Sequence, residues 1–416
     1  MSRTLQTVRG TQDLLPAAMR RHRAVVETAR VHAPRFGYEE IATPIFEFTD
    51  VFSRPIGETT DIVMKEMYTF ADKGGEEVTL RPEYTAGIIR AVISNGLTQS
   101  LPLRFFASGP MFRYERPQKG RFRQFHQIDA ELIGVKEPQG DVEVIALGAD
   151  ILGALGVLSR AELHLNTLGD ADSRRGYRDA LVGYFTQHAH KLSEDSRRRL
   201  ERNPLRILDS KDEADIALSA AAPHFEEYLT PASREFFGQV RAGLDALGIR
   251  YKLDPRLVRG LDYYTHTAFE FVTTELGSQG AVLAGGRYDG LMGVMGGPET
   301  PGVGWAAGIE RLALMIAEPA PPPRTIALVP IGAEGEAVAF KLAQDLRRDG
   351  FAVDLAYSGN LQKRMRRADR LKARAAVIIG DDELKRGQAA VRDLDTGAQS
   401  DVPLGALKER LASFRG

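Results

Sequence analysis

The first 318 residues carry two alternating patterns of apolar and polar positions. Several segments rich in aromatic and β-branched residues follow one another with few intervening helices, which favours a mostly antiparallel sheet. Other segments repeat apolar residues at helical spacing and predict helices that flank this sheet. The strand-like segments are 76–86, 103–115, 121–134, 161–169 and 265–276. The helical segments are roughly 16–35, 83–95, 140–155 and 305–317.

Two of the strand-like segments are joined by a charged turn. The connecting sequence RPQKG contains Pro117 and Gly120, which are typical turn residues, so a hairpin is expected. Side chains two residues apart on a strand share a face. Phe125 therefore lies on the same face as the ladder Gln127, Asp129 and Glu131, and this face is suited to stacking on a base and gripping a polar small molecule.

The remainder of the chain follows other patterns. Residues 170–250 are amphipathic with helical spacing and predict a helical insertion in the sheet domain. Four prolines in the segment EPAPPPR, 318–324, predict a short stiff spacer. Beyond it, strand-like and helical segments alternate up to the apolar run at 375–380, which predicts a small α/β domain with a parallel sheet.

Composition and charge exclude some kinds of functional site and favour others. The formal net charge is −1, but from Arg324 onward 17 basic residues stand against 13 acidic ones. Residues 363–374 contain seven bases and one acid, which favours a surface that faces phosphates over a merely solvated helix. The absence of cysteine excludes disulfides, thiolate zinc sites and cysteine nucleophiles. Neither a secretory signal nor a membrane span is visible, so a cytoplasmic location is expected.

Familiar nucleotide and metal motifs are not matched convincingly. No P-loop sequence occurs. The segment GVGWAA at 302–307 has the spacing of a dinucleotide motif, but it follows a polar loop rather than a strand and is interpreted as a glycine-lined turn before a helix. His188 and His190 lie in a polar helical stretch without neighbouring ligands and are expected to be solvated.

Two further segments carry candidate binding residues. Glu83 follows a proline at the start of a predicted helix, where it could bind an amine or simply complement the helix dipole. The segment 257–271 places Arg259 beside a glycine and crowds Tyr263 and Tyr264 into apolar surroundings, where a core role is the default for one tyrosine.

These residues together resemble a known family. Pro44 in IATPIFE, the hairpin MFRYERPQKGRFRQF, and GVGWAAGIERLAL with Arg311 resemble the three motifs of class II aminoacyl-tRNA synthetases. The segments LVRGLDYYTHTAFEF and AGGRYDGL resemble those of histidyl-tRNA synthetases, and the resemblance spans essentially the whole chain. Tyr84 departs from the pattern, because the family usually has glycine there.

The resemblance implies an α+β fold, with a class II antiparallel sheet flanked by helices, a helical insertion and a C-terminal α/β anticodon-binding domain. The implied domains are a catalytic domain in two parts at 1–169 and 251–318, the insertion at 170–250, a linker at 319–324 and the anticodon-binding domain at 325–416.

The resemblance also assigns roles to individual residues. Arg113 and Arg259 are the expected catalytic residues, placed on either side of the ATP α-phosphate. The expected histidine-binding residues are Glu83, Thr85, Arg113, Gln127, Glu131, Arg259, Tyr263 and Tyr264. The expected ATP-binding residues are Arg113, Glu115, Arg121, Phe125 and Arg311. The expected tRNA contacts are Arg116, Gln118, Lys119, Arg123, Lys363, Arg364 and Arg367.

The implied activity is ATP-dependent ligation of L-histidine to histidine tRNA by a homodimer that uses Mg²⁺ and is not membrane-bound; the Mg²⁺ ligands are unknown. The alternative is a non-catalytic, histidine-binding regulatory subunit of ATP phosphoribosyltransferase. Such paralogues usually lack the anticodon-binding domain and have degenerate catalytic motifs, whereas this chain keeps Arg113, Arg259 and Arg311. A plain RNA-binding protein would leave the pocket residues unexplained.

Overall fold

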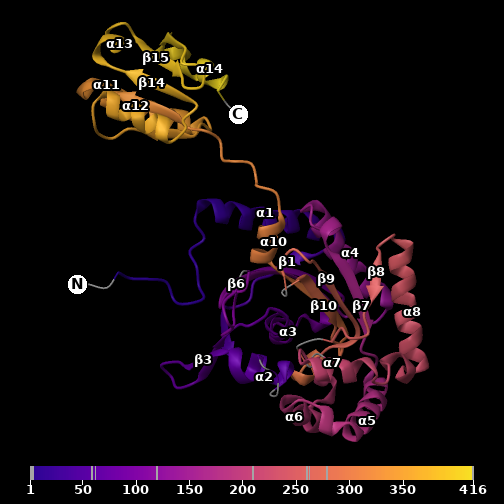
Figure 1. Ribbon diagram of the computed structural model, residues 1–416. Coiled ribbons are helices and arrows are strands. Elements are labelled where there is room, and N and C mark those ends of the chain that lie inside the picture. The colour runs from indigo at the N-terminus through magenta and orange to yellow at the C-terminus, as the bar shows by residue number, and fades with distance from the viewer. Residues whose placement is uncertain are drawn as a thin grey trace. The chain divides into compact units, whose positions relative to one another are not determined.

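This computed structural model describes residues 4–57, 60, 62–118, 120–208, 210–258, 261, 263–277 and 280–414. The chain divides into two compact units, Met1–Pro319 and Ala320–Gly416 (Figure 1). Among the described residues, no helix combines the length and apolar character that crossing a membrane requires.

An eight-stranded sheet forms the centre of the first unit, in the order β1-β5-β6-β11-β10-β9-β7-β8. The central pairings are antiparallel, and only the edge pairs β1–β5 and β7–β8 are parallel, which confirms the predicted mostly antiparallel sheet. The strands are β1 (Glu39–Glu40), β5 (Leu103–Phe112), β6 (Gln124–Ile133), β7 (Glu162–Thr167), β8 (Tyr251–Leu253), β9 (Thr265–Val272), β10 (Ala281–Arg287) and β11 (Gly302–Gly308).

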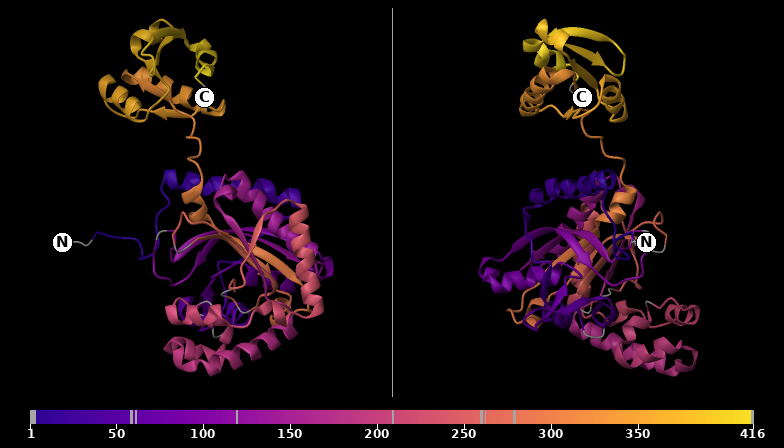
Figure 2. Two further views of the ribbon diagram at one scale, coloured as in Figure 1. Left: turned by 45° about the vertical axis from the view of Figure 1, so that its right-hand side comes forward. Right: turned by 90° about the vertical axis from the view of Figure 1, so that its left-hand side faces the viewer.

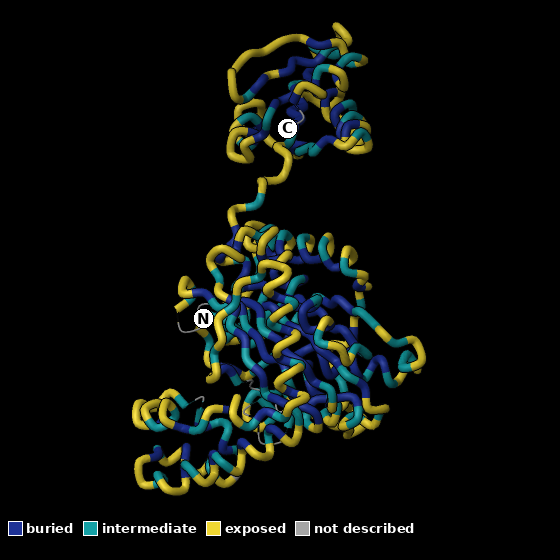
Figure 3. The backbone as a smooth tube through the Cα atoms, turned by 90° about the vertical axis from the view of Figure 1, so that its right-hand side faces the viewer, coloured by how far each residue is buried: buried dark blue, intermediate teal, exposed yellow. Residues whose placement is uncertain are grey.

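Helices cover the sheet on both faces, and each face has its own core (Figures 1 and 3). Ile128 and Ala130 of β6 pack in a core with residues of the helices α1 (Pro16–His32), α4 (Pro138–Ala154), α8 (Pro231–Ala246) and α10 (Ile309–Met315). Phe105 and Ala107 of β5 pack on the other face with the helices α2 (Asp50–Ile56), α3 (Thr85–Ser94) and α9 (Leu291–Val294). Strand alternation thus separates the two faces as the sequence predicted.

Two sequence expectations were wrong about individual segments. Residues 302–308 form the central strand β11 rather than a turn, and the helix expected from 305 begins at Ile309. The physical reason is close packing: a Cβ on Gly304 would lie 1.8 Å from Glu131 Oε2, so the glycine makes room for a neighbour within the sheet. Segment 76–86 contributes β4 (Glu77–Leu80), which pairs with β2 (Phe46–Phe48) and β3 (Tyr68–Ala71) in a separate three-stranded sheet.

The helical region predicted at 170–250 has two environments. The helices α5 (Ala171–Gln187), α6 (Glu194–Arg202) and α7 (Glu213–Ala220) lie together at the lower end of the unit in both views of Figure 2. Tyr177, Leu181 and Phe185 of α5 lie in a small core of this region. Helix α8 instead packs through Val240 and Leu244 into the core beside α4, so it belongs structurally to the sheet domain.

The second unit is an α/β domain around a five-stranded sheet, in the order β13-β12-β14-β15-β16. The predicted parallel pairing holds for β13-β12-β14, and an antiparallel hairpin that the sequence reading did not anticipate extends the sheet. The strands are β12 (Ile326–Pro330), β13 (Val353–Leu355), β14 (Ala375–Ile379), β15 (Gln388–Asp393) and β16 (Gln399–Pro403). The helices are α11 (Gly332–Arg348), α12 (Leu361–Arg370), α13 (Asp381–Lys385) and α14 (Leu407–Ala412).

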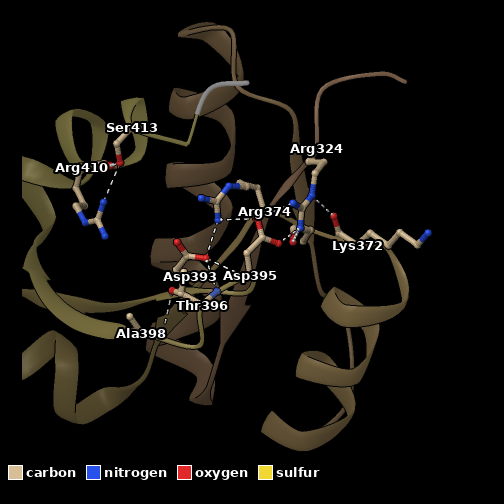
Figure 4. A network of polar contacts seen from close by, with 10 residues as sticks. Arg324, Lys372, Arg374, Asp393, Asp395, Thr396, Ala398, Arg410 and Ser413 are labelled. Carbon is tan, nitrogen blue, oxygen red and sulfur yellow. Dashed lines mark hydrogen bonds and ion pairs between the residues drawn. The ribbon is translucent and has the colours of Figure 1, made fainter. Parts of the chain in front are cut away.

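A polar network fixes the point where the chain enters this domain (Figure 4). Arg324 donates two hydrogen bonds of 2.8 Å to the carboxylate of Asp395 and two more to the carbonyls of Lys372 and Ala373. Arg374 donates to Asp393 at 2.7 Å. The predicted proline-rich spacer at 319–324 therefore ends at a residue that is held on the domain surface.

Candidate active site

A cavity of about 260 Å³ lies over the strands β6, β9, β10 and β11 of the first unit. The structure brings most of the predicted histidine- and ATP-binding residues to its walls. They are Glu83, Thr85, Arg113, Glu115, Arg121, Phe125, Gln127, Tyr263, Tyr264 and Arg311. Asp129 and Glu270, which were not predicted as site residues, line it too.

The predicted histidine-binding residue Glu131 does not itself line the cavity, although Thr85, to which it is hydrogen-bonded, does. Arg259 and Lys119 lie outside the described residues. Leu261, two positions after Arg259, lines the cavity. Arg116 is exposed in the hairpin and does not line the cavity.

Apart from Glu115 Oε2, which is ion-paired with Arg121, three acceptor atoms in the cavity wall have no hydrogen-bond partner among the described residues. They are Glu83 Oε2, Gln127 Oε1 and Asp129 Oδ2, and each is shielded from solvent. Glu83 is oriented through its other oxygen, which accepts a 2.8 Å hydrogen bond from the backbone of Ala86. Buried acceptors are costly when unpaired, so this trio is suited to a ligand with several N–H donors. Asp129 was missed as a site residue although its place on the Gln127 face was recognised.

Burial also sets the electrostatics of the trio. Removal from water raises the pKa of Glu83 and raises the pKa of Asp129 well above its usual range. Burial lowers the pKa of Arg113, an effect partly offset by the nearby carboxylates of Glu66 and Glu83. A cationic ligand that binds here would therefore favour the ionised form of the Glu83 and Asp129 carboxyl groups.

Glu131 lies on β6, opposite Gly304 of β11, and is 1% exposed. Its Oε1 accepts a 2.6 Å hydrogen bond from Thr85 Oγ1, and its Oε2 accepts one from the hydroxyl of Tyr288. Tyr288 was not predicted as a site residue, although it belongs to the segment AGGRYDGL. The two hydroxyls hold the carboxylate in a fixed orientation.

The pKa of Glu131 predicts a specific pH dependence of stability. Burial raises this pKa to about 8, while Thr85 and Tyr288 oppose the shift through their hydrogen bonds. In the unfolded chain the group ionises near its ordinary pKa, so its stabilising contribution is complete below that value and is lost as pH rises through about 8. We expect Glu131→Gln to flatten the decline of the unfolding free energy between about pH 5 and about pH 8.

Urea unfolding of the ligand-free protein at the two ends of this pH interval measures the effect. Glu137→Gln, which changes an exposed carboxylate on the same segment, should keep the decline seen in the parent protein. An identical decline in the parent and in Glu131→Gln would refute the assignment.

The charged hairpin is internally paired in this structure. Arg121 forms an ion pair with Glu115, and Arg113 lies 3.9 Å from the same carboxylate. Arg123 stacks on the ring of Tyr114 at 3.7 Å and donates to the carbonyl of Glu115 at 3.2 Å. The Nε of Arg121 is therefore occupied by Glu115 while its other N–H donors can still bind a phosphate, and Arg123 already helps to hold the hairpin.

Of the arginines that the structure describes, Arg113, Arg121 and Arg311 line the cavity with their guanidinium groups. Arg311 donates a 2.7 Å hydrogen bond to the carbonyl of Ala281. Burial lowers its pKa, and the charges of Arg121 and Arg113 lower it further. Since these cations repel one another, a multiply charged anion is the ligand that this arrangement favours.

Tyr84, the departure from the family pattern, is packed beneath the site rather than inside it. It is 1% exposed, its hydroxyl donates to the carbonyl of Ser108 at 3.1 Å, and the guanidinium of Arg81 lies 4.1 Å from its ring centroid. A Cβ on Gly109 would lie 2.7 Å from the tyrosine hydroxyl, so the glycine makes room for this larger side chain.

The predicted tRNA contacts on helix α12 differ in how far they are exposed to solvent. Lys363 is exposed, whereas Arg364 is 5% exposed and bonds to Glu336 at 2.6 Å and to the carbonyls of Gly359 and Pro330. Arg367 is paired with Asp354 at 2.7 Å. As placed, Arg364 serves the fold of the domain and would reach RNA only by giving up these bonds.

The cavity lies in a chain that is similar to known proteins along its whole length. Sequence models described as histidyl-tRNA synthetase and as anticodon binding domain match residues 10–312 and 325–413. A histidine–tRNA ligase of Rhodospirillum rubrum is 61% identical over 411 residues, 99% of each chain. One of Gluconacetobacter diazotrophicus is 56% identical over 413 residues, 99% of this chain and 100% of the relative.

A solved structure agrees. The apo histidyl-tRNA synthetase of S. aureus superposes with a TM-score of 0.82 at 36% identity, covering 98% of this chain and 99% of that one. Both the fold and the sequence thus match over nearly the full length. This chain therefore belongs to the histidyl-tRNA synthetase family.

Proposed function

We propose that the protein activates L-histidine with ATP to histidyl-adenylate and transfers the histidyl group to the 3′ end of histidine tRNA. The observation that carries the amino-acid site is the trio of unpaired acceptors on Glu83, Gln127 and Asp129. An α-ammonium group offers three N–H donors and a positive charge, which matches three acceptors of which two are carboxylates.

The side chain of histidine is assigned to the part of the cavity lined by Thr85 and Gly304, next to the buried Glu131. Tyr264 lines the cavity, and each carboxylate oxygen of Glu131 has a second lone pair beyond its bond to a hydroxyl. An amino acid of similar size without ring nitrogens could not form these additional bonds. Sites of this kind can discriminate by about 10⁴–10⁵-fold.

ATP, which carries Mg²⁺ as part of the substrate, is assigned to the guanidinium groups. Arg113 would contact the α-phosphate, Arg121 the outer phosphates, and Phe125 with Arg311 would enclose the adenine. The histidine carboxylate attacks the α-phosphorus while charge develops on the phosphoryl oxygens, and fixed guanidinium donors stabilise that charge. Catalysis is otherwise the positioning of two anions that would repel each other in water.

Two residues of this proposal are assigned through the sequence resemblance. Arg259 is assigned to the side of the α-phosphate opposite Arg113. Glu115 is assigned to the adenine amino group, which requires that ATP first separates it from Arg121.

Two surfaces are proposed to bind tRNA. The exposed Arg116 and Gln118 of the hairpin, with Lys119 and Arg123, are assigned to the acceptor end. Helix α12 is assigned to the anticodon arm, because Lys363, Arg366 and Arg370 are exposed on it.

The charge of α12 gives a direct test of this second surface. Replacing Lys363 and Arg366 together by glutamate should raise the aminoacylation KM for tRNA about tenfold or more, since phosphate contacts dominate such affinities. Histidine-dependent pyrophosphate exchange, which needs no tRNA, should be unchanged. Lys341→Glu with Arg348→Glu makes the same charge change on exposed positions of α11. If both double variants behave alike, α12 is not the tRNA surface.

A homodimer is proposed because one face of the three-stranded sheet exposes apolar side chains to solvent. In the three-stranded sheet, the polar Thr79 is fully buried, whereas Phe46, Phe48 and Phe70 are 50–58% exposed. Phe48 and Phe70 both lie opposite Val78 of β4 and so share one face. An apolar face directed outward from a folded chain is suited to a second copy. Sedimentation equilibrium that gives a monomer at all concentrations would rule this out.

Charging of tRNA tests the proposed function as a whole. The purified protein should attach labelled histidine to histidine tRNA in the presence of Mg²⁺ and ATP. The alternative, a regulatory subunit of ATP phosphoribosyltransferase, predicts histidine binding without charging. Full-length identity of 61% and 56% to histidine–tRNA ligases supports the catalytic reading.

A further inference from the structure

A second polar cluster lies next to the cavity, and one of its members, Glu310, also lines the cavity. His126 points to the side on which α1 and α10 pack, because it alternates with Phe125 and Gln127. Its Nδ1 lies 2.8 Å from Glu310 Oε1, and its backbone N–H donates to Glu310 Oε2 at 2.9 Å. The imidazole of His22, from α1, meets that of His126 edge-on with ring centroids 4.6 Å apart.

His22 is the unexplained member of this cluster. The residue is 8% exposed, and neither ring nitrogen has a hydrogen-bond partner among the described residues. A buried imidazole needs a partner for both nitrogens, because burying unpaired polar atoms is costly. Burial lowers the pKa of His22 and the neighbouring His126 lowers it further, while Glu310 acts in the opposite direction.

We propose that His22, His126 and Glu310 form a binding site for a divalent transition-metal ion, with zinc as the best-fitting occupant. One ligand atom from each residue lies within 4.8 Å of the others. Two imidazoles and a carboxylate are a common set of three protein ligands for zinc, with the fourth position left to water. Imidazole ligands favour zinc over magnesium, so the site differs in kind from the Mg²⁺ that accompanies ATP.

The geometry requires a modest closure on binding. Ligand atoms around a tetrahedral zinc lie about 3.3 Å apart, given Zn–N and Zn–O bonds of about 2.0–2.1 Å. Rotation of His22 and His126 about their side-chain bonds can supply the difference, since they sit on separate elements, α1 and β6. Bound zinc would fasten α1, β6 and α10 together directly behind Phe125 and Arg311, and it should stabilise the first unit.

Zinc binding to tag-free protein tests the proposal, since a polyhistidine tag would itself bind the metal. After removal of metals with a chelator, the parent protein should take up one zinc per chain at this site, measured by elemental analysis after gel filtration. Added zinc sulfate should raise the Tm by about 4 °C when its concentration is about a hundred times Kd. Cobalt(II) in place of zinc should give the strong visible absorption of a four-coordinate site.

Matched variants separate this site from adventitious binding. His22→Gln should lose the zinc, the Tm shift and the cobalt absorption, whereas His190→Gln, at an exposed histidine, should retain all three. Glu310→Gln provides a second removal of a ligand if His22→Gln is unstable. Failure of the parent protein to retain zinc, or equal retention by His22→Gln and the parent, overturns the proposal. Either result leaves the proposed charging activity untouched.

Discussion

Arg113→Lys should lower the kcat of histidine-dependent ATP–pyrophosphate exchange by about 10²–10³-fold, the usual cost of removing one preorganised donor from a developing anion. Arg113 is held by a 2.9 Å hydrogen bond from its Nε to the carbonyl of Pro82 and lies over Phe125. Lysine keeps the positive charge but loses the planar fork and this anchoring bond. The loss should therefore fall on kcat more than on the KM for ATP.

Arg116→Lys is the matched control for this variant. Arg116 belongs to the same hairpin but is exposed and does not line the cavity, so exchange should stay within about twofold. If Arg113→Lys keeps near-parent kcat, the proposed transition-state contact is wrong and Arg113 has only a structural role.

Glu83→Gln should reduce kcat/KM for histidine by about 10²-fold, while the KM for ATP changes little. The substitution keeps the shape of the side chain and an oxygen that can accept from the backbone of Ala86, but it removes the charge that faces the ammonium group. Loss of one charged member of a buried pair typically costs about 2–5 kcal/mol, and each 1.4 kcal/mol is tenfold.

Steady-state exchange at varied histidine and saturating ATP measures this effect. Glu76→Gln alters an exposed carboxylate shortly before Glu83 and should behave as the parent protein does. A Glu83→Gln protein with an unchanged histidine KM would show that Glu83 acts only on the start of α3, as a helix N-terminal acid does.

The fold was predictable where the chain alternates regularly. The strands β5 and β6 and the turn between them follow from alternation and from Pro117 and Gly120. The strand β11 was not predicted, because its glycines have no side chains and therefore show no alternation of apolar and polar positions. Gly304 is needed there because Glu131 approaches closely from the neighbouring strand. Helices α8 and α5 have the same amphipathic pattern in the sequence. Only the packing of α8 against α4 shows that it belongs to the sheet domain.

The site was predictable through the resemblance far more than through the residues alone. The alternation that placed Gln127 also placed Asp129, but its unpaired oxygen is a property of the fold. Charge density on α12 indicated a surface that faces phosphates, yet it could not separate the exposed Lys363 from the buried Arg364. The cluster of His22, His126 and Glu310 joins residues remote in sequence, and no local pattern predicts it.

The central claim is that this cavity activates histidine and no other amino acid. Pyrophosphate exchange with ATP and Mg²⁺, measured separately with each of the twenty amino acids, tests it most directly. We expect exchange with histidine and only background with the other nineteen, because the proposed site pairs an imidazole with Glu131 and Tyr264 and an ammonium group with the acceptor trio. Absence of exchange with histidine, or comparable exchange with another amino acid, would contradict it.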